Sequence, residues 1–167
     1  MVETAEKKSN LMGNSQNLEQ QFLTFRMGND EYGVDILAVQ EIHIWVEPRP
    51  MPNTPDYIRG VIDWRGTIVP IIDLRMRFKY PDATYTATTV VIILQTKMSD
   101  SDQYCIIGIV VDAVADVYDI SLEELKKAPR MGSNIDTKYI KGLTKIENSM
   151  IIILDIEKLI NLEELTS

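Results

Sequence analysis

The sequence has very little of the two residue types that most often build metal and nucleophilic sites. In 167 residues it contains one cysteine, Cys105, and one histidine, His43. A single cysteine cannot form an internal disulfide, and a reducing cytoplasm is the compartment that fits best. Zinc sites and Ser-His or Cys-His nucleophile systems need clusters of these residues. We therefore expect no metal and no cofactor, and we expect His43 to be a hydrogen-bonded or exposed side chain.

Long apolar runs and an excess of basic charge are also missing. The longest unbroken apolar runs, Val90 to Leu94 and Met150 to Leu154, are far shorter than the ~20 residues that span a bilayer. Residues 1–21 lack the apolar core of a secretion signal. The chain carries 17 basic and 25 acidic residues, whereas nucleic-acid binding depends on Lys and Arg that neutralise phosphates. The sequence predicts no secretion, no membrane insertion and no nucleic-acid partner.

The chain does contain enough apolar residues for a core, and they are weighted towards strand formers. The hydrophobic content is 45%, at the low edge of the range for globular domains. Ile and Val account for 34 residues, against three Phe and two Trp. Because β-branched residues favour strands, we predict a mainly β fold.

Alternating apolar residues, interrupted by turn residues, predict a series of β-hairpins. The expected strand pairs are 22–27 with 32–36, 58–64 with 68–74, 88–96 with 104–112, and two strands within 139–154. Pro70 indicates an edge strand or a bulge in the second pair. Residues 1–21 are polar and lack periodicity, so we predict a disordered N-terminal tail.

Proline and capping signals mark the segments between these hairpins. Four of the seven prolines lie between Pro48 and Pro55, which indicates an extended loop. Ser121-Leu122-Glu123-Glu124 has the spacing of a capping box and predicts a short helix that ends before Pro129.

An internal repeat is the most informative pattern in the chain. Tyr57-Ile58-Arg59-Gly60-Val61 returns as Tyr139-Ile140-Lys141-Gly142-Leu143, and Ile71-Ile72-Asp73-Leu74 returns as Ile153-Leu154-Asp155-Ile156, both at an offset of 82 residues. Upstream, 38–42 matches 113–117 at an offset of 75. Two copies are too few for a solenoid, so the repeat predicts two small β-barrels packed as lobes. The seam between the lobes is the expected binding groove.

The repeated Asp73 and Asp155 invite comparison with aspartic proteases, in which two carboxylates from similar lobes share a proton. That chemistry needs Thr or Ser and then Gly after each Asp, whereas Leu74-Arg75 and Ile156-Glu157 follow here. The favoured interpretation is that each Asp ends a strand and caps a short helix, over 74–78 and 156–160. Glycine-rich phosphate motifs are missing as well, so no catalytic constellation is present.

Charge is unevenly distributed along the sequence. The segment from Arg49 to Lys79 holds six basic residues, while Asp100 to Glu124 holds seven acids and no base. These segments are either two solvated faces or complementary surfaces that orient partners. Arg65, beside Gly66 at a hairpin tip, is either a turn residue or a guanidinium placed to bond a carboxylate.

The motifs together resemble the CheW-like domain family, the coupling proteins of bacterial chemotaxis. The resemblance covers Phe22 to about Leu162 and is carried by the following segments: 32–36, 39–42, 58–75, 108–112 and 139–142. It implies two pseudo-repeated five-stranded β-barrel subdomains with short helices. The expected organisation is a tail at 1–21, a domain of two interleaved barrel lobes at 22–162 and a C-terminal tail at 163–167.

The resemblance also implies a function, a non-catalytic adaptor that couples the cytoplasmic tips of methyl-accepting chemoreceptors to the regulatory domain of the histidine kinase CheA. The expected location is the cytoplasm, with recruitment to receptor arrays and self-association in rings. The residues that would bind the receptor are Val39, Glu41, Gly60, Arg65, Val90 and Val117. Those that would contact the kinase are Ile36, Val46, Glu47, Arg49, Met51, Lys126 and Met131.

Two departures from the family pattern concern the partner surfaces. Asp63-Trp64 stand before Arg65-Gly66, where the family commonly has Asn-Leu, and Lys126 and Met131 replace Arg and an aromatic residue. Trp64 either alters the groove or fills the core. The competing function is a small-molecule-binding or enzymatic barrel that uses the groove between the lobes.

Overall fold

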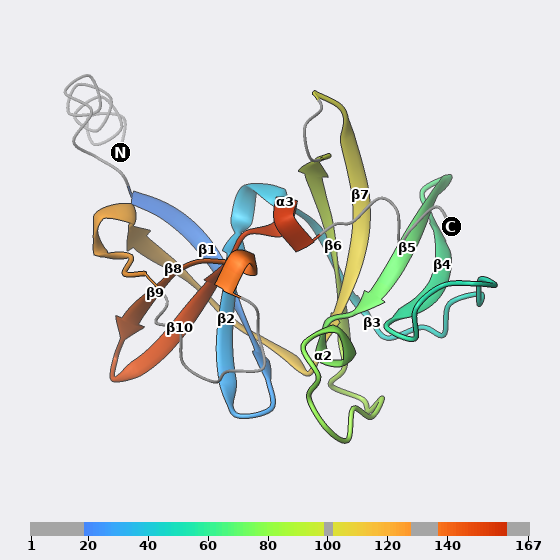
Figure 1. Cartoon of the computed structure of the whole chain (residues 1–167), viewed down its shortest axis with the longest axis horizontal. Coiled ribbons are helices and arrows are strands. Elements are labelled where there is room, and N and C mark those ends of the chain that lie inside the picture. The colour runs from blue at the N-terminus through green and yellow to red at the C-terminus, as the bar shows by residue number, and fades with distance from the viewer. Residues whose placement is uncertain (1–18, 99–101, 128–136, 160–167) are drawn as a thin grey trace.

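Two five-stranded sheets lie side by side in the computed structural model, which describes residues 19–98, 102–127 and 137–159 (Figure 1). One sheet has the strand order β8 (Ala113–Ser121), β1 (Glu19–Met27), β2 (Asp30–Asp35), β10 (Ser149–Leu154) and β9 (Ile140–Ile146). The other has the order β3 (Val39–Ile44), β6 (Val90–Lys97), β7 (Tyr104–Val111), β5 (Thr67–Asp73) and β4 (Ile58–Trp64).

The helical elements are short and lie at strand ends. They are η1 (Ile36–Ala38), α2 (Leu74–Arg77), η2 (Leu122–Glu124), η3 (Thr137–Tyr139) and α3 (Ile156–Leu159). Within the described residues, none of the helices has the length and apolar character needed to cross a membrane.

The two sheets have the same topology, which confirms the predicted repeat. Each contains one parallel pair, β5 with β7 and β10 with β2, among antiparallel neighbours. The hairpins β4–β5 and β9–β10 are the copies related by 82 residues. Both close with two positive-φ residues, Arg65 and Gly66 in one and Glu147 and Asn148 in the other, as type I′ turns require.

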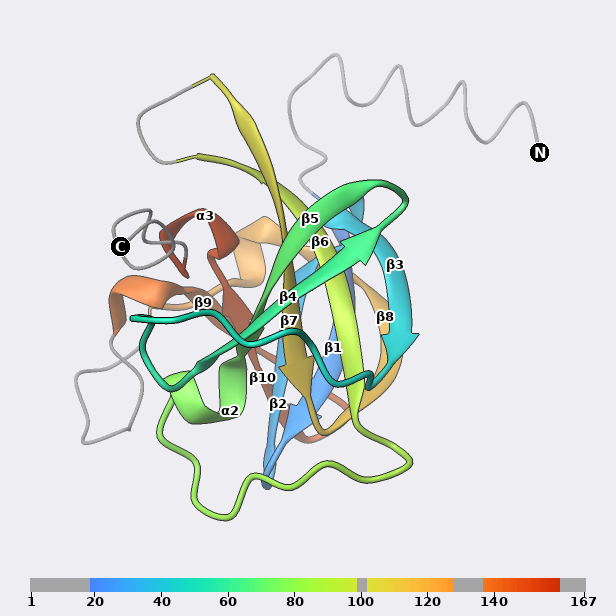
Figure 2. The same ribbon diagram turned by 90° about the vertical axis from the view of Figure 1, so that its right-hand side faces the viewer.

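The two lobes are interleaved along the chain. Strands β3 to β7 form one continuous lobe, which faces the viewer in Figure 2, whereas the other lobe joins the N-terminal hairpin β1–β2 to the C-terminal strands β8 to β10. The repeat in the sequence therefore does not divide the structure into an N-terminal and a C-terminal half.

A backbone bridge joins the two edges of each sheet. Arg49, downstream of β3, exchanges two hydrogen bonds of 2.9 Å with Val61 of β4. Lys126, downstream of β8, exchanges equivalent bonds of 2.9 and 2.8 Å with Leu143 of β9. Closure of a sheet on itself removes its free edges, so the predicted pair of small barrels is confirmed.

The strands at the centre of each sheet are buried on both faces. In β6, Ile92 and Leu94 enter the core between the lobes, while Val91 and Ile93 fill the interior of their own barrel. In β10, Leu154 packs in the core between the lobes and Ile153 in the interior of its own barrel. Strands covered on both faces read as continuous apolar runs, which explains 90–94 and 151–154.

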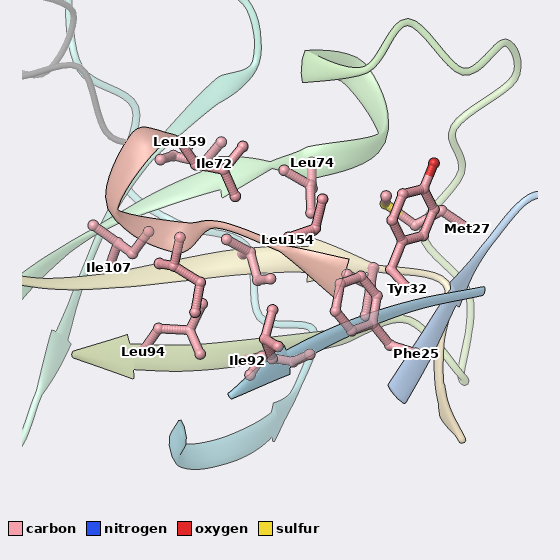
Figure 3. Close-up of a cluster of buried hydrophobic side chains, with 14 of the residues drawn as sticks. Phe25, Met27, Tyr32, Ile72, Leu74, Ile92, Leu94, Ile107, Leu154 and Leu159 are labelled. Atoms are coloured by element: carbon pink, nitrogen blue, oxygen red, sulfur yellow. The ribbon is translucent and has the colours of Figure 1, made fainter. Parts of the chain in front are cut away.

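The central core packs one lobe onto the other (Figure 3). Phe25 and Tyr32 come from one lobe, Ile92 and Leu94 from the other, and Leu159 of α3 lies among them. All five side chains are at most 5% exposed. The centre of the seam is therefore filled with side chains, and the expectation of an open groove along it is wrong there.

One predicted boundary is wrong, and another lies outside the described residues. Strand β1 begins at Glu19, not at Phe22, because residues 19–21 pair with 119–121 of β8 through backbone hydrogen bonds that need no apolar pattern. Residues 1–18 and 160–167, which include the expected C-terminal tail, lie outside the described residues.

The helix expected after Ser121 is only the 3-10 turn η2, and its capping is not that of a capping box. The Ser121 hydroxyl accepts from the N–H of Glu123 at 3.3 Å. The chain cannot continue as a helix because Lys126 must be extended to bridge Leu143.

Pro70 lies in a strand with neighbours on both sides, yet at a position where no N–H is needed. Its partner across the β4–β5 ladder, Val61, directs its N–H and C=O away from Pro70, towards Arg49. The parallel pairing of β5 with β7 begins one residue later, at Ile71. The expected edge strand is therefore wrong for β5, while an irregularity of the β4–β5 ladder does lie next to Pro70, opposite Ile71 and Ile72.

A buried ion network lies at the start of α2. Asp73, which is fully buried, accepts from the backbone N–H of Arg75 at 3.0 Å and so caps the helix as predicted. The Arg75 guanidinium donates to both oxygens of Asp73 and, at 2.9 Å, to Asp112. Tyr85 donates to Asp73 at 2.8 Å, and burial together with this bond raises the pKa of Tyr85 to about 12.

Asp112 carries this network into the other lobe. Its carboxylate accepts from the N–H of Gly28, in the β1–β2 turn, at 2.7 Å, and its backbone N–H donates to Arg26. The network thus adds directional bonds to the apolar packing that joins the lobes.

Replacement of Arg75 by Met should lower the free energy of unfolding by about 3–5 kcal/mol, because it leaves the Asp73 carboxylate buried without its cation. Urea denaturation would measure the loss. Arg26→Met, at an exposed position of β1, is the matched control and should change stability by at most about 0.5 kcal/mol. Equal small losses in both variants would contradict the importance of the network.

Candidate functional site

Glu41 joins the two edges of one barrel. It lies on β3, at one end of the strand order, and its partners lie on β4 and the following turn, at the other end. Trp64 Nε1 donates to Glu41 Oε2 at 3.1 Å, and Arg65 donates to Oε1 at 2.9 Å. His43 Nε2 lies 2.8 Å from the same Oε2. The carboxylate therefore has three side-chain partners while remaining 28% exposed.

Arg65 stands on the tip of the β4–β5 hairpin in a strained backbone conformation. Its φ is 52°, a region that costs a residue with a side chain roughly 1–2 kcal/mol. The side chain is 69% exposed, and its guanidinium lies over the Trp64 ring at 4.9 Å from the centroid. Glu147 of the equivalent β9–β10 turn has the same conformation, so this strain belongs to the turn type.

His43 is partnered and partly exposed, as expected. Among the residues that the structure describes, no group of three or more His, Cys, Asp or Glu side chains could hold a metal ion. Cys105 lies at an intermediate depth, where burial raises the pKa of its thiol.

The outward face of β3 is apolar, which inverts the usual pattern of a surface strand. Glu41 and His43 face the closed side of the barrel and are half-buried, whereas Gln40, Ile42 and Ile44 are exposed. Val39, before a bulge in the ladder, packs against the central core instead. Ile44 is 70% exposed. The neighbouring Leu37 and Val46 are exposed too. Clustered exposed apolar side chains of this kind mark a binding surface.

We call the following set the β3 surface: Leu37, Glu41, Ile42, Ile44 and Arg65. The sequence pattern alone did not single out Leu37, Ile42 or Ile44 as binding residues, because apolar residues of a strand are ordinarily buried. The sequence did contain one indication of their exposure. Ile42 and Ile44 follow the polar Gln40 at intervals of two residues, whereas Val39 belongs to the other alternating set.

A small hollow of about 120 Å³ opens beside the β3 surface. Two polar side chains, His43 and Asp63, line part of it. The other lining residues are apolar: Ile44, Val46, Ile62, Trp64, Ile71 and Val91. The hollow lies between the same two barrel edges that Glu41 joins.

The structure brings together only some of the residues expected to bind a receptor. Glu41 and Arg65 are in contact, and Val39 lies on the same strand as Glu41. Val90 begins β6 and pairs with Ile44, at the far end of the β3–β6 ladder from Val39. Val117 lies on β8 in the other sheet and is 42% exposed.

Gly60 is buried beneath the chain's own backbone. A Cβ at this position would lie 2.1 Å from the carbonyl oxygen of Arg49, and φ is 138°. The missing side chain therefore allows the bridge between Arg49 and Val61 to form. Its repeat partner Gly142 lies under Leu125 and Lys126 in the same way.

The residues expected to contact the kinase fall in two places. Ile36, in η1, is half-buried against the central core, and the others of the first lobe lie in the segment after β3: Val46, Glu47, Arg49 and Met51. Lys126 is exposed at the equivalent bridge of the second lobe. Met131 lies outside the described residues.

The uneven charge of the sequence only partly becomes surface charge. Arg75 is buried, and Arg77 lies between the rings of Tyr57 and Tyr139. The remaining basic residues of this segment are exposed: Arg49, Arg59, Arg65 and Lys79. On the other lobe, β8 and η2 expose four acids: Asp116, Asp119, Glu123 and Glu124.

Replacement of Gly60 by Ala should lower the free energy of unfolding by at least about 2 kcal/mol, because the new methyl group meets backbone that cannot rotate away. Gly66→Ala is the control, since that position also has a positive φ but no atom within 4 Å. It should cost about 1 kcal/mol. If thermal unfolding showed equal losses, the Arg49 bridge would not depend on Gly60.

The two equivalent turns allow the contacts of Arg65 to be separated from its strain. Asn tolerates positive φ, so Glu147→Asn should raise the free energy of unfolding by up to about 1 kcal/mol. Arg65→Asn should gain less than Glu147→Asn, because it also loses the contacts with Glu41 and Trp64. Chemical denaturation of both variants would measure the difference, and equal gains would mean that these contacts contribute nothing to stability.

Comparison with known proteins identifies relatives over most of the chain. Residues 21–164 match the family model described as the CheW-like domain. The chemotaxis protein CheW of Klebsiella aerogenes is 44% identical over 146 residues, covering 87% of this chain and 84% of that protein. CheW of Treponema pallidum is 34% identical, with 87% and 84% coverage. The crystal structure of the scaffolding protein TtCheW from Thermoanaerobacter tengcongensis superposes with a TM-score of 0.75 at 30% identity, covering 87% of this chain and 90% of that one.

Proposed function

The chain belongs to the CheW-like domain family, and from this membership we propose that it couples chemoreceptor tips to the histidine kinase CheA. It is a chemotaxis scaffolding protein of a non-catalytic family. In our proposal the β3 surface receives the helical hairpin of a receptor tip, and the loops after β3 and β8 contact the kinase. The protein would act in the cytoplasm, recruited to receptor arrays.

The observation that carries the receptor assignment is the inverted face of β3. Ile42 and Ile44 project from an edge strand into solvent, next to the charged pair of Glu41 and Arg65. A helix that docks in this way presents apolar residues at helical spacing, and the flanking charges select its orientation. Val39, Val90 and Val117 remain proposed extensions of this surface, while the buried Gly60 supports it from within.

The kinase assignment rests on the twofold likeness of the lobes. Arg49 and Lys126 stand at equivalent bridges, one on each barrel. A kinase domain of the same fold would carry the same two bridge regions, one on each of its barrels. Contacts that alternate between the two proteins could then build a ring. The exposed basic residues of the first lobe, Arg49, Arg59 and Lys79, and the acidic β8 of the second favour head-to-tail contacts between unlike lobes. Ile36, Val46, Glu47, Met51 and Met131 complete the proposed contacts.

The alternative of a small-molecule or enzymatic barrel finds little support. Such a site needs an enclosed cavity with a few convergent polar groups, whereas the centre of the seam is filled by the side chains of the central core. The hollow beside the β3 surface, about 120 Å³, is well below the ~300–1,000 Å³ typical of ligand pockets, and a second hollow beside Trp45, Arg59 and Tyr85, about 320 Å³, is only at the lower end of that range.

Replacement of Ile44 by Ser should weaken binding to a soluble chemoreceptor tip fragment about tenfold, because it removes an exposed apolar contact from the β3 surface. Binding to the CheA regulatory domain should remain unchanged, since its proposed contacts lie elsewhere. Titration calorimetry against each fragment would measure both affinities. The fold should survive, because substitutions at exposed positions rarely change stability by more than about 0.5 kcal/mol.

Met150→Ser is the matched control. Met150 is 61% exposed on β10 of the other lobe, so the chemical change is similar and the surface is different. A wild-type protein that bound neither fragment would refute the coupling function. An equal loss of receptor affinity in Ile44→Ser and Met150→Ser would refute the assignment of the β3 surface.

A further inference from the structure

Trp64 connects the barrel interior to the charged pair of the β3 surface. One side of its ring packs against a buried apolar cluster that includes Val69, Ile71 and Val91. Its Nε1 donates to Glu41 at 3.1 Å. Because Trp64 pairs with Thr67 across the last rung of the β4–β5 ladder, its backbone is fixed as well. The indole is thus held by packing and by the sheet before it makes its polar contact.

The contact with Trp64 changes what Glu41 can do. A half-exposed glutamate has several rotamers, and an exposed ion pair alone holds a side chain weakly. Trp64 and Arg65 approach different oxygens of the carboxylate, which orients its plane. His43 shares Oε2 with Trp64, but a histidine donates from Nε2 only when that nitrogen carries a proton. The indole N–H and the Arg65 guanidinium are both permanent donors, but only the indole is also held by packing on the buried cluster, so it is the rigid partner that fixes the carboxylate.

Trp64 also orients Arg65. The guanidinium is 69% exposed and lies 4.9 Å from the centroid of the indole ring. When a guanidinium lies over an aromatic ring, its N–H donors point along its own plane and not into the ring. They remain available to groups beside it. One side chain therefore sets the geometry of both charged groups of the β3 surface.

We propose that Trp64 is a positioning residue of the receptor-binding surface, which holds the Glu41 carboxylate and the Arg65 guanidinium in the arrangement that the receptor tip recognises. This inference rests on the proposed function. It assigns to Trp64 a role in partner binding, and not only the filling of the core. Pre-arranged groups bind more tightly because their ordering is completed before the partner arrives.

The decisive variant is Trp64→Phe, which keeps an aromatic ring against the cluster and removes the N–H donor. Its thermal midpoint should stay close to that of the wild type, while its affinity for a soluble chemoreceptor tip fragment falls about three- to tenfold, the scale of one lost hydrogen bond. Trp45→Phe is the matched control, since Trp45 stacks on Tyr85 at 4.1 Å. Trp45→Phe should leave receptor affinity unchanged, and Trp64→Phe should bind the CheA regulatory domain like the wild type.

A double-mutant cycle separates positioning from simple packing. If Trp64 acts through Glu41, Trp64→Phe should cost no further receptor affinity once Glu41→Ala is present. If Trp64 only fills the core, the two losses should multiply, and the proposal is then wrong.

A spectroscopic signature provides an independent readout. The chain has two tryptophans, so a proton–nitrogen NMR spectrum shows two indole N–H signals, which Trp45→Phe assigns. Glu41→Ala should move the Trp64 signal and leave that of Trp45 in place. An unmoved Trp64 signal would overturn the hydrogen bond on which the inference depends.

The outcomes also distinguish this inference from the proposed function. A wild-type protein that failed to bind the receptor fragment would overturn both. Normal wild-type binding together with undiminished affinity of Trp64→Phe would overturn the role of Trp64 alone.

Discussion

Packing on both faces of the central strands is the constraint on which the rest of the structure depends. Strands β5, β6, β7 and β10 place alternate side chains in the core between the lobes and in the interior of their own barrel. A shift of one residue in register would exchange these two sets, so the register of the inner strands is determined on both sides. Only the edge strands and the turns remain available for partners, and the candidate site lies there.

Closure of the first barrel and presentation of its binding surface depend on the same side chains. Glu41 on one edge contacts Trp64 and Arg65 on the other, in addition to the backbone bridge that Gly60 permits. Because Glu41 and His43 face this junction, the alternate residues of β3, Ile42 and Ile44, must face solvent. The apolar surface is therefore a direct consequence of how the barrel closes.

The lobes are joined by directional bonds as well as by the central core. Asp112 links the buried Asp73–Arg75 pair to the β1–β2 turn, and Tyr80, after α2, bonds to Tyr32 and Asp30 of β2. Buried ion pairs add little net stability but penalise arrangements that break them. They favour one relative placement of the lobes.

Patterns in the sequence determined the hairpins, the duplication, the capping by Asp73 and the family, because each depends on local periodicity or on a motif of neighbouring residues. The contact of Glu41 with Trp64, the burial of Arg75 and the exposure of Ile44 could not be predicted in this way. Each depends on which sheet edges meet when the barrels close, and on the pairing of the β1–β2 hairpin with the C-terminal strands β8 and β10. Tertiary packing alone decided these features, because an alternating pattern shows that a strand has two faces but does not show what will cover each of them.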